Sequence, residues 1–255
     1  MAQVRPYYSD RGLSAAYYDV VTAADTRLVG DIDLYASLVR PGGRILELGA
    51  GAGRVAIALA ERGFAVTGVD LAPAMLAQAQ AKRDGLPAEV AARLDFRLAD
   101  MTALDLQSAF DLVVCPYFTL AHVPAGAAWR NTFAVAARHL PLGRLAAFHL
   151  PRLEIMREAP PIDPRVPVFD QPLKDGGRLR IHVLERVFRE AAGRLDQVLA
   201  YVVLDPRGDV RAHSKERLTY YMADPVPLAA AAGLATVREP IDIGGVGDIH
   251  VFEKR

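Results

Sequence analysis

The sequence has little of three features that would point directly to a compartment or a partner: cysteine, excess charge and long apolar runs. Its one cysteine, Cys115, excludes an internal disulfide and a metal site built from several thiolates. Lys plus Arg and Asp plus Glu both number 30, so the basic excess typical of nucleic-acid-binding proteins is missing. No uninterrupted apolar run approaches the roughly 20 residues of a membrane span, and the N-terminal residues contain no stretch of signal-peptide length. We therefore expect a cytoplasmic protein that has no nucleic-acid, membrane or metal partner.

What the sequence does contain is a regular alternation of strand-like and helix-like segments between residues 44 and 150. The hydrophobic content is 52%, which is enough for a full core in a chain of 255 residues. Short apolar runs predict strands at 44–48, 64–70, 94–100, 110–118 and 144–150, and helices are predicted at 54–62, 74–84 and 127–140. This alternation predicts an α/β fold with a doubly wound, mostly parallel, Rossmann-like sheet, whose seven strands include two near the C-terminus.

The pattern changes after residue 150. Residues 151–172 are rich in proline and predict an irregular connection, whereas 178–190, 194–205 and 210–222 alternate like antiparallel strands. A helix remains an alternative for part of the first of these three. Residues 225–240 and 248–255 return to a helix and strands. We therefore predict a core over residues 1–159, an antiparallel β insertion over 160–222 that forms a cap or a homodimer interface, and a last core segment over 223–255.

The segment "ELGAGAG" at 47–53 joins the first predicted strand to a helix. Glycines there let a ligand approach the backbone, and the helix N-terminus offers N–H groups to negatively charged atoms. A dinucleotide fingerprint needs its third glycine at position 54, where this chain has Arg54. Glu47 suits a cation better than a pyrophosphate, and Asp70, at the end of the next strand, can accept hydrogen bonds from a ribose diol. The loop therefore disfavours the pyrophosphate of a nicotinamide or flavin cofactor.

Together with "GVDLAPAML" at 68–76, "LADM" at 98–101, "FDLVVC" at 110–115 and "LPLGRLAAFHL" at 140–150, this loop resembles the motif series of class I S-adenosylmethionine (SAM)-dependent methyltransferases of the small-molecule type. The resemblance implies SAM as cofactor and S-adenosylhomocysteine (SAH) as product, with the glycine loop under the amino-acid end of SAM. It assigns Glu47 to the methionyl ammonium, Asp70 to the ribose hydroxyls and Asp100 to the adenine amino group. The cofactor-binding residues that it implies are Glu47, Gly49, Ala50, Gly51, Gly53, Asp70, Leu71, Met75, Asp100, Met101 and Cys115, with Leu71 and Met101 flanking the adenine.

Two segments are similar to the substrate side of such enzymes. The segment "YFTLAHV" at 117–123 resembles part of small-molecule methyltransferases that act on amino groups, which makes His122 a candidate substrate-facing group or base. Tyr18 matches a tyrosine on an N-terminal lid helix that closes over SAM in this family. For both residues ordinary packing is the alternative, as it is for His149 at the end of the fifth predicted strand. The "CPYF" segment at 115–118 differs from the Asn/Asp-Pro-Pro-aromatic tetrad of amino-directed nucleobase methylases, which counts against a DNA adenine substrate.

Four of the polar residues in the predicted insertion, Arg180, His182, Arg186 and Arg189, either face an anionic substrate or solvate an exposed sheet. The function that the sequence favours is methyl transfer from SAM to O or N, and less readily C, of a small-molecule metabolite. A SAM- or SAH-binding protein that does not transfer methyl is one alternative. A NAD-dependent oxidoreductase, which Arg54 and Glu47 disfavour, is another, and the balanced charge disfavours a macromolecular substrate.

Overall fold

In the computed structural model, which describes residues 3–158 and 162–255, the protein divides into two compact units. The α/β unit comprises Arg27–Arg152 and Met222–Arg255. The sheet unit comprises Met1–Thr26 and Leu153–Tyr221. Each unit is therefore assembled from two separate segments of the chain.

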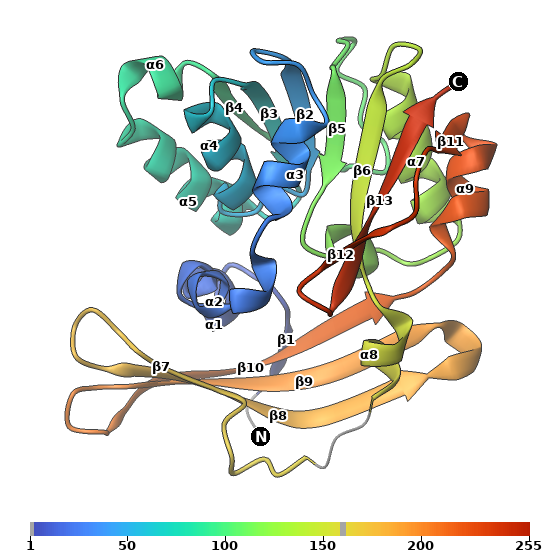
Figure 1. Ribbon diagram of the computed structural model, residues 1–255. Coiled ribbons are helices and arrows are strands. Elements are labelled where there is room, and N and C mark those ends of the chain that lie inside the picture. Colours follow the sequence, from blue (N-terminus) through green and yellow to red (C-terminus); the bar gives the residue numbers. More distant parts are fainter. Residues whose placement is uncertain (1–2, 159–161) are drawn as a thin grey trace. The chain divides into compact units, whose positions relative to one another are not determined.

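The α/β unit contains a mixed sheet with the strand order β11-β13-β6-β5-β2-β3-β4, and β12 pairs with β13 (Figure 1). The strands are β2 (Arg44–Leu48), β3 (Ala65–Asp70), β4 (Leu94–Leu98), β5 (Leu112–Cys115), β6 (Leu145–Pro151), β11 (Leu234–Thr236), β12 (Ile241–Ile243) and β13 (Gly247–Lys254). Neighbouring strands from β2 to β6 are parallel, whereas β13 is antiparallel to β6. The predicted doubly wound, mostly parallel fold is confirmed, and β12 is a short strand in addition to the seven predicted.

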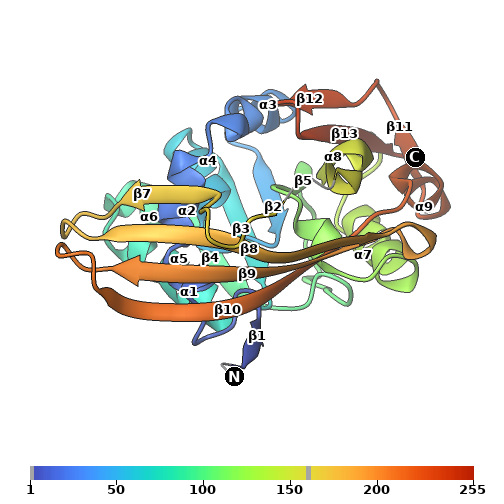
Figure 2. The ribbon, with the colours of Figure 1, turned by 90° about the horizontal axis from the view of Figure 1, so that it is seen from below.

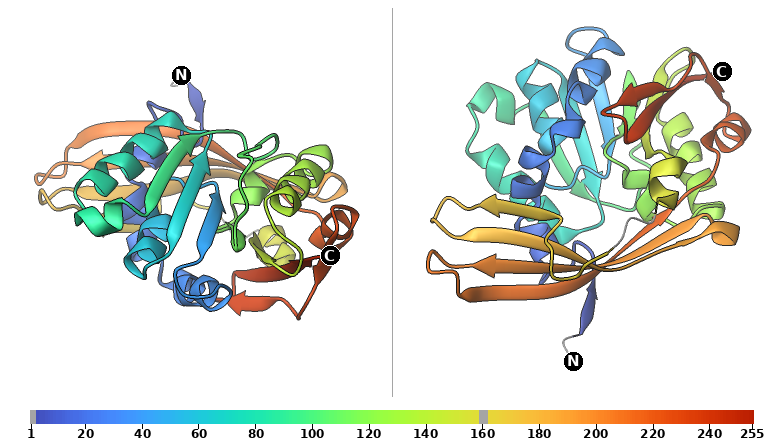
Figure 3. Two further views of the ribbon diagram at one scale, coloured as in Figure 1. Left: turned by 90° about the horizontal axis from the view of Figure 1, so that it is seen from above. Right: turned by 60° about the horizontal axis from the view of Figure 1, so that its bottom comes forward.

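Helices cover both faces of this sheet (Figure 1, Figure 3). They are α3 (Asp31–Ser37), α4 (Arg54–Glu61), α5 (Pro73–Asp84), α6 (Ala88–Ala91), α7 (Ala127–Arg138) and α9 (Pro225–Ala231), with short 3₁₀ turns at Thr26–Leu28 and Thr119–His122. Because successive side chains of a strand point to opposite faces, Leu46 lies in one core with Phe133 of α7, and Ile45 lies in the other core with Leu59 of α4. The sheet is thus buried on both sides.

The strand order reverses at β2, whose neighbours in the sheet are β3 and β5. In sheets of this kind, ligands bind outside the carboxyl ends of the strands at the point of reversal. The glycine loop directly follows β2. The topology therefore puts this loop where a ligand is expected.

The sheet unit is dominated by three long antiparallel strands, which Figure 2 shows side by side. Its elements are β1 (Val4–Pro6), α1 (Leu13–Ala16), α2 (Tyr18–Ala24), α8 (Leu153–Arg157), β7 (Phe169–Pro172), β8 (Arg178–Arg189), a 3₁₀ turn (Glu190–Ala192), β9 (Arg194–Leu204) and β10 (Val210–Tyr221). The three predicted strands are present, and the helix considered for part of residues 178–190 is wrong. The stretch 151–172, predicted to be irregular, contains α8 and β7, while residues 159–161 lie outside the described part of the chain.

The N-terminal segment, which the sequence assigned to the core, groups with the sheet unit instead. β1 pairs in parallel with β10, and Val4 lies opposite Lys215. The carboxylate of Glu216, buried in β10, accepts hydrogen bonds from the backbone N–H groups of Leu13 and Ser14 at 2.6 and 3.2 Å. Contacts between residues so far apart in the chain leave no local sequence pattern, so this grouping could not be predicted. The predicted domain boundaries themselves stay predictions.

Candidate active site

The glycine loop requires glycine for both conformation and space. Gly49, Gly51 and Gly53 have φ angles of +78°, +53° and +85°, in the left-handed region that side chains disfavour. A Cβ atom on Gly49 would lie 2.0 Å from Cγ2 of Thr119, which follows β5. The N–H groups of Gly49 and Ala50 donate to the carbonyl of Val69 at 2.8 and 2.9 Å. The loop is thereby fixed between the ends of β3 and β5.

Asp70 lies beside this loop at the end of β3. Its carboxylate accepts hydrogen bonds from the N–H groups of Gly51 and Ala72, both at 2.8 Å. Burial raises the pKa of Asp70 above its ordinary value, and the N–H groups of Ala72, Gly51 and Leu71 oppose that rise. Asp70 therefore lies at the carboxyl end of its strand, as the sequence predicts, and its role in binding a ribose stays a prediction.

Glu47, the predicted partner of a cation, lies beneath the loop and is 1% exposed. The N–H of Ala56 in α4 donates to its carboxylate, and its Oε2 atom is buried without a hydrogen-bond partner among the described residues. Burial raises the pKa of Glu47 well above its ordinary value; Arg54 and the Ala56 N–H lower it, and Asp70 and Asp31 raise it. An unpaired buried carboxyl oxygen is costly unless a ligand or a proton satisfies it.

Arg54, the first residue of α4, binds Asp31, the first residue of α3. Both carboxylate oxygens of Asp31 accept from the guanidinium, with an Nη1–Oδ1 distance of 3.2 Å for one of them. Asp31 is 1% exposed, and Cζ of Arg54 lies 5.8 Å from the ring centroid of Tyr117. In the sequence, Arg54 served only to disfavour a dinucleotide cofactor, and its partner Asp31 was not predicted. A cation at a helix N-terminus opposes the helix dipole, and this could have prompted a search for a buried acid.

The chain after β5 makes a sharp turn at two aromatic residues. Tyr117 and Phe118 have φ angles of +48° and +62°, which are uncommon for residues other than glycine. The Phe118 N–H donates to the carbonyl of His149 at 3.2 Å, and their ring centroids are 4.7 Å apart. Consecutive left-handed residues of this kind cluster at functional sites. The turn directs the chain from β5 toward Thr119, against the glycine loop.

Two histidines occupy this part of the α/β unit. His122 ends the 3₁₀ turn Thr119–His122, and burial lowers its pKa to about 4. His149, in β6, is fully buried, neither ring nitrogen has a hydrogen-bond partner among the described residues, and burial lowers its pKa to about 4 as well. Both imidazoles are therefore neutral near pH 7. His122 stays the predicted substrate-facing residue.

The residues predicted around the adenine lie after β3 and β4. Leu71 is 67% exposed, and Asp100 is exposed and accepts hydrogen bonds from the N–H and the hydroxyl of Thr102, both at 2.8 Å. Met101 is half-buried, whereas Met75 and Cys115 are buried in the interior, where burial raises the pKa of the Cys115 thiol. An exposed leucine beside an exposed acid is consistent with a surface that an adenine would cover. The cofactor roles of all these residues stay predictions.

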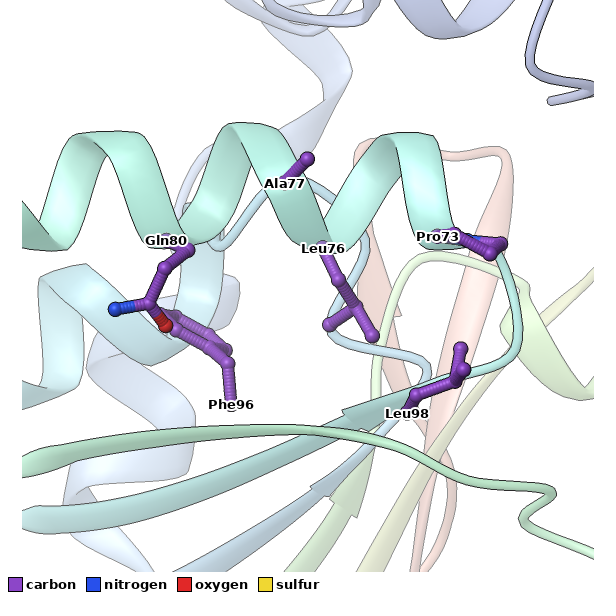
Figure 4. A pocket seen from close by; sticks show the side chains of 6 residues that line it. All are labelled: Pro73, Leu76, Ala77, Gln80, Phe96 and Leu98. Atoms are coloured by element: carbon purple, nitrogen blue, oxygen red, sulfur yellow. The ribbon is translucent and has the colours of Figure 1, made fainter.

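An open hollow lies on the flank of the sheet between α5 and the edge strand β4 (Figure 4). Its lining residues are Pro73, Leu76, Ala77, Gln80, Phe96 and Leu98. Leu98, at the carboxyl end of β4, is 62% exposed. The hollow is mostly apolar, and it borders the chain segments that carry Leu71 and Asp100.

The four polar residues for which the sequence left open either an anionic substrate or an exposed sheet all lie in the sheet unit and have partners there. Arg180 binds Asp170, His182 binds the carbonyl of Pro164, Arg186 binds the carbonyls of Ile155, Met156 and Glu158, and Arg189 binds Asp196. These contacts support the structural interpretation that the sequence left open. Tyr18, the first residue of α2, is half-buried, and its ring lies 5.9 Å from that of Tyr8.

Within residues 3–158 and 162–255, no cluster of three or more His, Cys, Asp or Glu side chains could hold a metal ion. None of the helices described is both long and apolar enough to cross a membrane.

Comparison with known proteins identifies the region around the glycine loop. Residues 45–143 match the family model of a methyltransferase domain. The matched residues lie within the α/β unit. A protein named as a methyltransferase in Geobacillus sp. (strain WCH70) is 40% identical over 91 residues, which are 36% of this chain and 35% of that protein. The chain spans about a third of the length of the curated relatives that it matches.

Solved structures resemble the chain well beyond the methyltransferase domain. The CcbJ methyltransferase from Streptomyces caelestis is 22% identical and aligns over 98% of both chains with a TM-score of 0.74. The sugar N-methyltransferase KedS8 from Streptoalloteichus sp ATCC 53650 is 22% identical and aligns over 93% of this chain and 92% of its own, with a TM-score of 0.68. At this identity the likeness is one of fold. The domain match and the fold confirm the resemblance to class I SAM-dependent methyltransferases that the sequence motifs indicate.

Proposed function

We propose that the protein transfers the methyl group of SAM to a small molecule, with an amino nitrogen as the first acceptor to test and a hydroxyl oxygen as the second. The observation that carries the proposal is the pair of carboxyl groups at the glycine loop. Asp70 lies against Gly51, and Glu47 lies beneath the loop with a buried, unpaired oxygen. A ligand that joins a diol to a cation satisfies both groups, and SAM, with its ribose and its methionyl ammonium, is such a ligand.

We assign three carboxyl groups of the α/β unit to three parts of SAM. Asp70 would accept hydrogen bonds from the ribose hydroxyls, Glu47 would pair with the ammonium, and Asp100 would accept from the adenine amino group. When bound, SAM supplies a methyl group that its positive sulfur already activates. What the protein must add is alignment of the acceptor with that methyl and exclusion of water.

The kind of acceptor is proposed from two considerations. A structural neighbour of the chain is a sugar N-methyltransferase, which supports an amino group. An amine attacks through its lone pair: the N–C bond forms while the S–C bond breaks, SAH leaves, and the nitrogen then loses a proton to solvent. Because burial holds the pKa of His122 at about 4, its neutral imidazole is a poor carrier of that proton but a good hydrogen-bond acceptor. We assign His122 to the orientation of the amine.

Titration calorimetry with SAM, SAH and NADH, followed by mass spectrometry with a panel of amino sugars, tests the proposal. We expect SAM and SAH to bind, NADH not to bind, and an amino sugar to become heavier by one methylene. Binding of SAM without a methylated product from amino or hydroxyl acceptors would favour a SAM-binding protein without transferase activity. Binding of NADH in place of SAM would favour the oxidoreductase. The proposed role of Tyr18 beside the transferred methyl is tested by Tyr18→Phe, which removes only the hydroxyl.

A further inference from the structure

The Asp31–Arg54 pair has no role in the proposed methyl transfer, yet its acid is buried and both residues act electrostatically on Glu47. The guanidinium of Arg54 is engaged with both carboxylate oxygens of Asp31, and the backbone N–H of Ile32 donates to Oδ1 of Asp31 at 2.8 Å. Burying an ion pair is expensive. Asp31 is only 1% exposed. The pair joins the N-termini of two helices beside the glycine loop, and we therefore ask what it does there.

The groups that face Glu47 come from every element around it. α4 contributes Arg54, β3 contributes Asp70, and α3 contributes Asp31. The phenol of Tyr35 in α3 and the thiol of Cys115 in β5 also lie within electrostatic reach of Glu47. Two of these acids, Asp70 and Asp31, raise the pKa of Glu47, and the guanidinium that lowers it is bound to Asp31. Glu47 is left with the N–H of Ala56 and an unpaired Oε2.

We propose that Asp31, by holding Arg54, keeps Glu47 protonated in the cofactor-free protein, and that Glu47 releases this proton when the ammonium of the cofactor binds. The inference rests on the proposed binding of SAM. In the step, the O–H bond of the Glu47 carboxyl breaks, the proton passes to the buffer, and the carboxylate pairs with the ammonium. Asp31 is a positioning residue in this account, because it acts on Glu47 through Arg54.

The electrostatics of the site agree with this assignment. Burial is the largest cause that raises the pKa of Glu47, and Asp70 and Asp31 add to it. A neutral carboxyl avoids the large penalty of an uncompensated buried charge. An arriving ammonium removes that penalty and favours the ionised form. By linkage, the affinity for SAM should rise with pH as long as the free protein holds the proton that the complex lacks.

The test is titration calorimetry near pH 7 in buffers that differ in ionisation enthalpy, which measures the protons released per bound ligand. For the wild-type protein we expect a release approaching roughly one proton with SAM and with SAH. Methylthioadenosine, which has the nucleoside but no ammonium, should bind without this release. Glu47→Gln should abolish the release and weaken SAM by about 10- to 100-fold, with little effect on methylthioadenosine.

Asp31 is tested by three variants. Asp31→Asn frees Arg54 to pair with Glu47, so we expect the proton release to fall. The double variant Asp31→Asn/Arg54→Met removes both charges, so we expect the release to return, which a merely structural role of Asp31 would not produce. The matched control is Asp33→Asn on the same helix, where the exposed Asp33 binds Arg62; it should leave the release unchanged.

The outcomes separate this inference from the proposed function. If neither SAM nor SAH binds, both proposals are overturned. If SAM binds without proton release, or if Glu47→Gln releases as much as the wild type, only the proton exchange is overturned. Should Asp31→Asn fail to fold, infrared difference spectra of the wild type against Glu47→Gln still decide the state of Glu47, because a protonated carboxyl band must disappear on SAM binding. The double variant Asp31→Asn/Arg54→Met then tests the positioning role of Asp31. If it releases no proton on binding SAM, that role is overturned.

Discussion

Carboxyl groups are held differently in the two units. In the sheet unit, Asp170 accepts hydrogen bonds from the guanidinium groups of Arg178 and Arg180, at 2.7 and 3.1 Å. In the α/β unit, Glu47 has one backbone donor and a buried oxygen without a partner. A carboxylate enclosed by cations is part of the structure that surrounds it. A buried carboxyl with incomplete hydrogen bonding indicates that a ligand, or a proton, completes it.

Glu216 in the sheet unit also has a buried carboxyl group with incomplete hydrogen bonding. Its Oε2 atom is also buried without a partner among the described residues. Its Oε1 atom, however, accepts from Leu13, Ser14 and the hydroxyl of Ser214. This carboxylate already has its function, which is to attach the N-terminal segment to β10. An unpaired oxygen alone therefore identifies a ligand site less well than an unpaired oxygen beside a glycine loop.

The largest effect is expected at Asp70. An Asp70 variant that bound SAM as tightly as the wild type would contradict the difference drawn between the two units. Asp70→Asn keeps the size of the side chain but loses charge-assisted bonds to the ribose, so we expect SAM affinity to fall by about 100- to 1,000-fold. Calorimetry measures this directly. Asp170→Asn, in the sheet unit, is the matched control and should leave SAM affinity unchanged; equal losses in both variants would contradict the assignment.

At His122 we expect a smaller effect, confined to turnover. His122→Ala removes the group that orients the acceptor, and we expect kcat to fall by about 100-fold with SAM affinity retained. Because the wild-type pKa is about 4, the imidazole is neutral above that value. The pH–rate profile of the wild type should therefore show no inflection from His122 near the ordinary histidine pKa of about 6.5. An inflection there that disappears in His122→Ala would restore the general-base role.

For Glu216 the effect should appear in stability rather than in binding. Glu216→Ala leaves the N–H groups of Leu13 and Ser14 without their buried acceptor, and we expect a loss of about 1–3 kcal/mol in the free energy of unfolding. Glu216→Gln keeps an acceptor oxygen and should lose less. Thermal unfolding of both variants is the measurement, and an equal loss would mean that charge, not hydrogen bonding, matters there.

The smallest effect is expected at Arg180. Its contact with Asp170 is partly exposed, so Arg180→Ala should change stability by less than about 1 kcal/mol and leave KM unchanged. A large rise in KM would restore the hypothesis that Arg180 contacts an anionic substrate.

Arg178 is the largest cause that lowers the pKa of Asp170. That contribution to stability is present above the unfolded pKa of about 3.9 and is lost as the pH falls through the folded pKa. When the unfolding free energy is followed as the pH is lowered, Arg178→Ala should lose less stability than the wild type.

How much the sequence could predict depends on the distance between interacting residues. Glu47 and the glycines lie within seven consecutive positions, and Asp70 ends the next strand, so local motifs and the family resemblance were enough to predict them as a site. Asp31 lies 23 residues before Arg54 in a segment without a recognisable motif. Its partner was visible only as a cation placed unfavourably at a helix start. The pairing of β1 with β10 left no local trace, and β7, β12 and α8 are too short to produce a periodic signal.

The pairing of β1 with β10, the first and last strands of the sheet unit, also determines when this unit can fold during synthesis. Leu13 is separated from the carboxylate of Glu216 by 203 residues. At roughly 5–20 residues per second on the ribosome, the N-terminal segment waits on the order of 10–40 s before β10 emerges. Tyr17, Val20 and Val21, which pack against the apolar core of the sheet unit, stay uncovered for that interval, whereas the first parallel strands of the α/β unit can already associate. Residues 13–26 thus need protection in the nascent chain, and a rearranged gene that encodes them next to β10 should shorten that period.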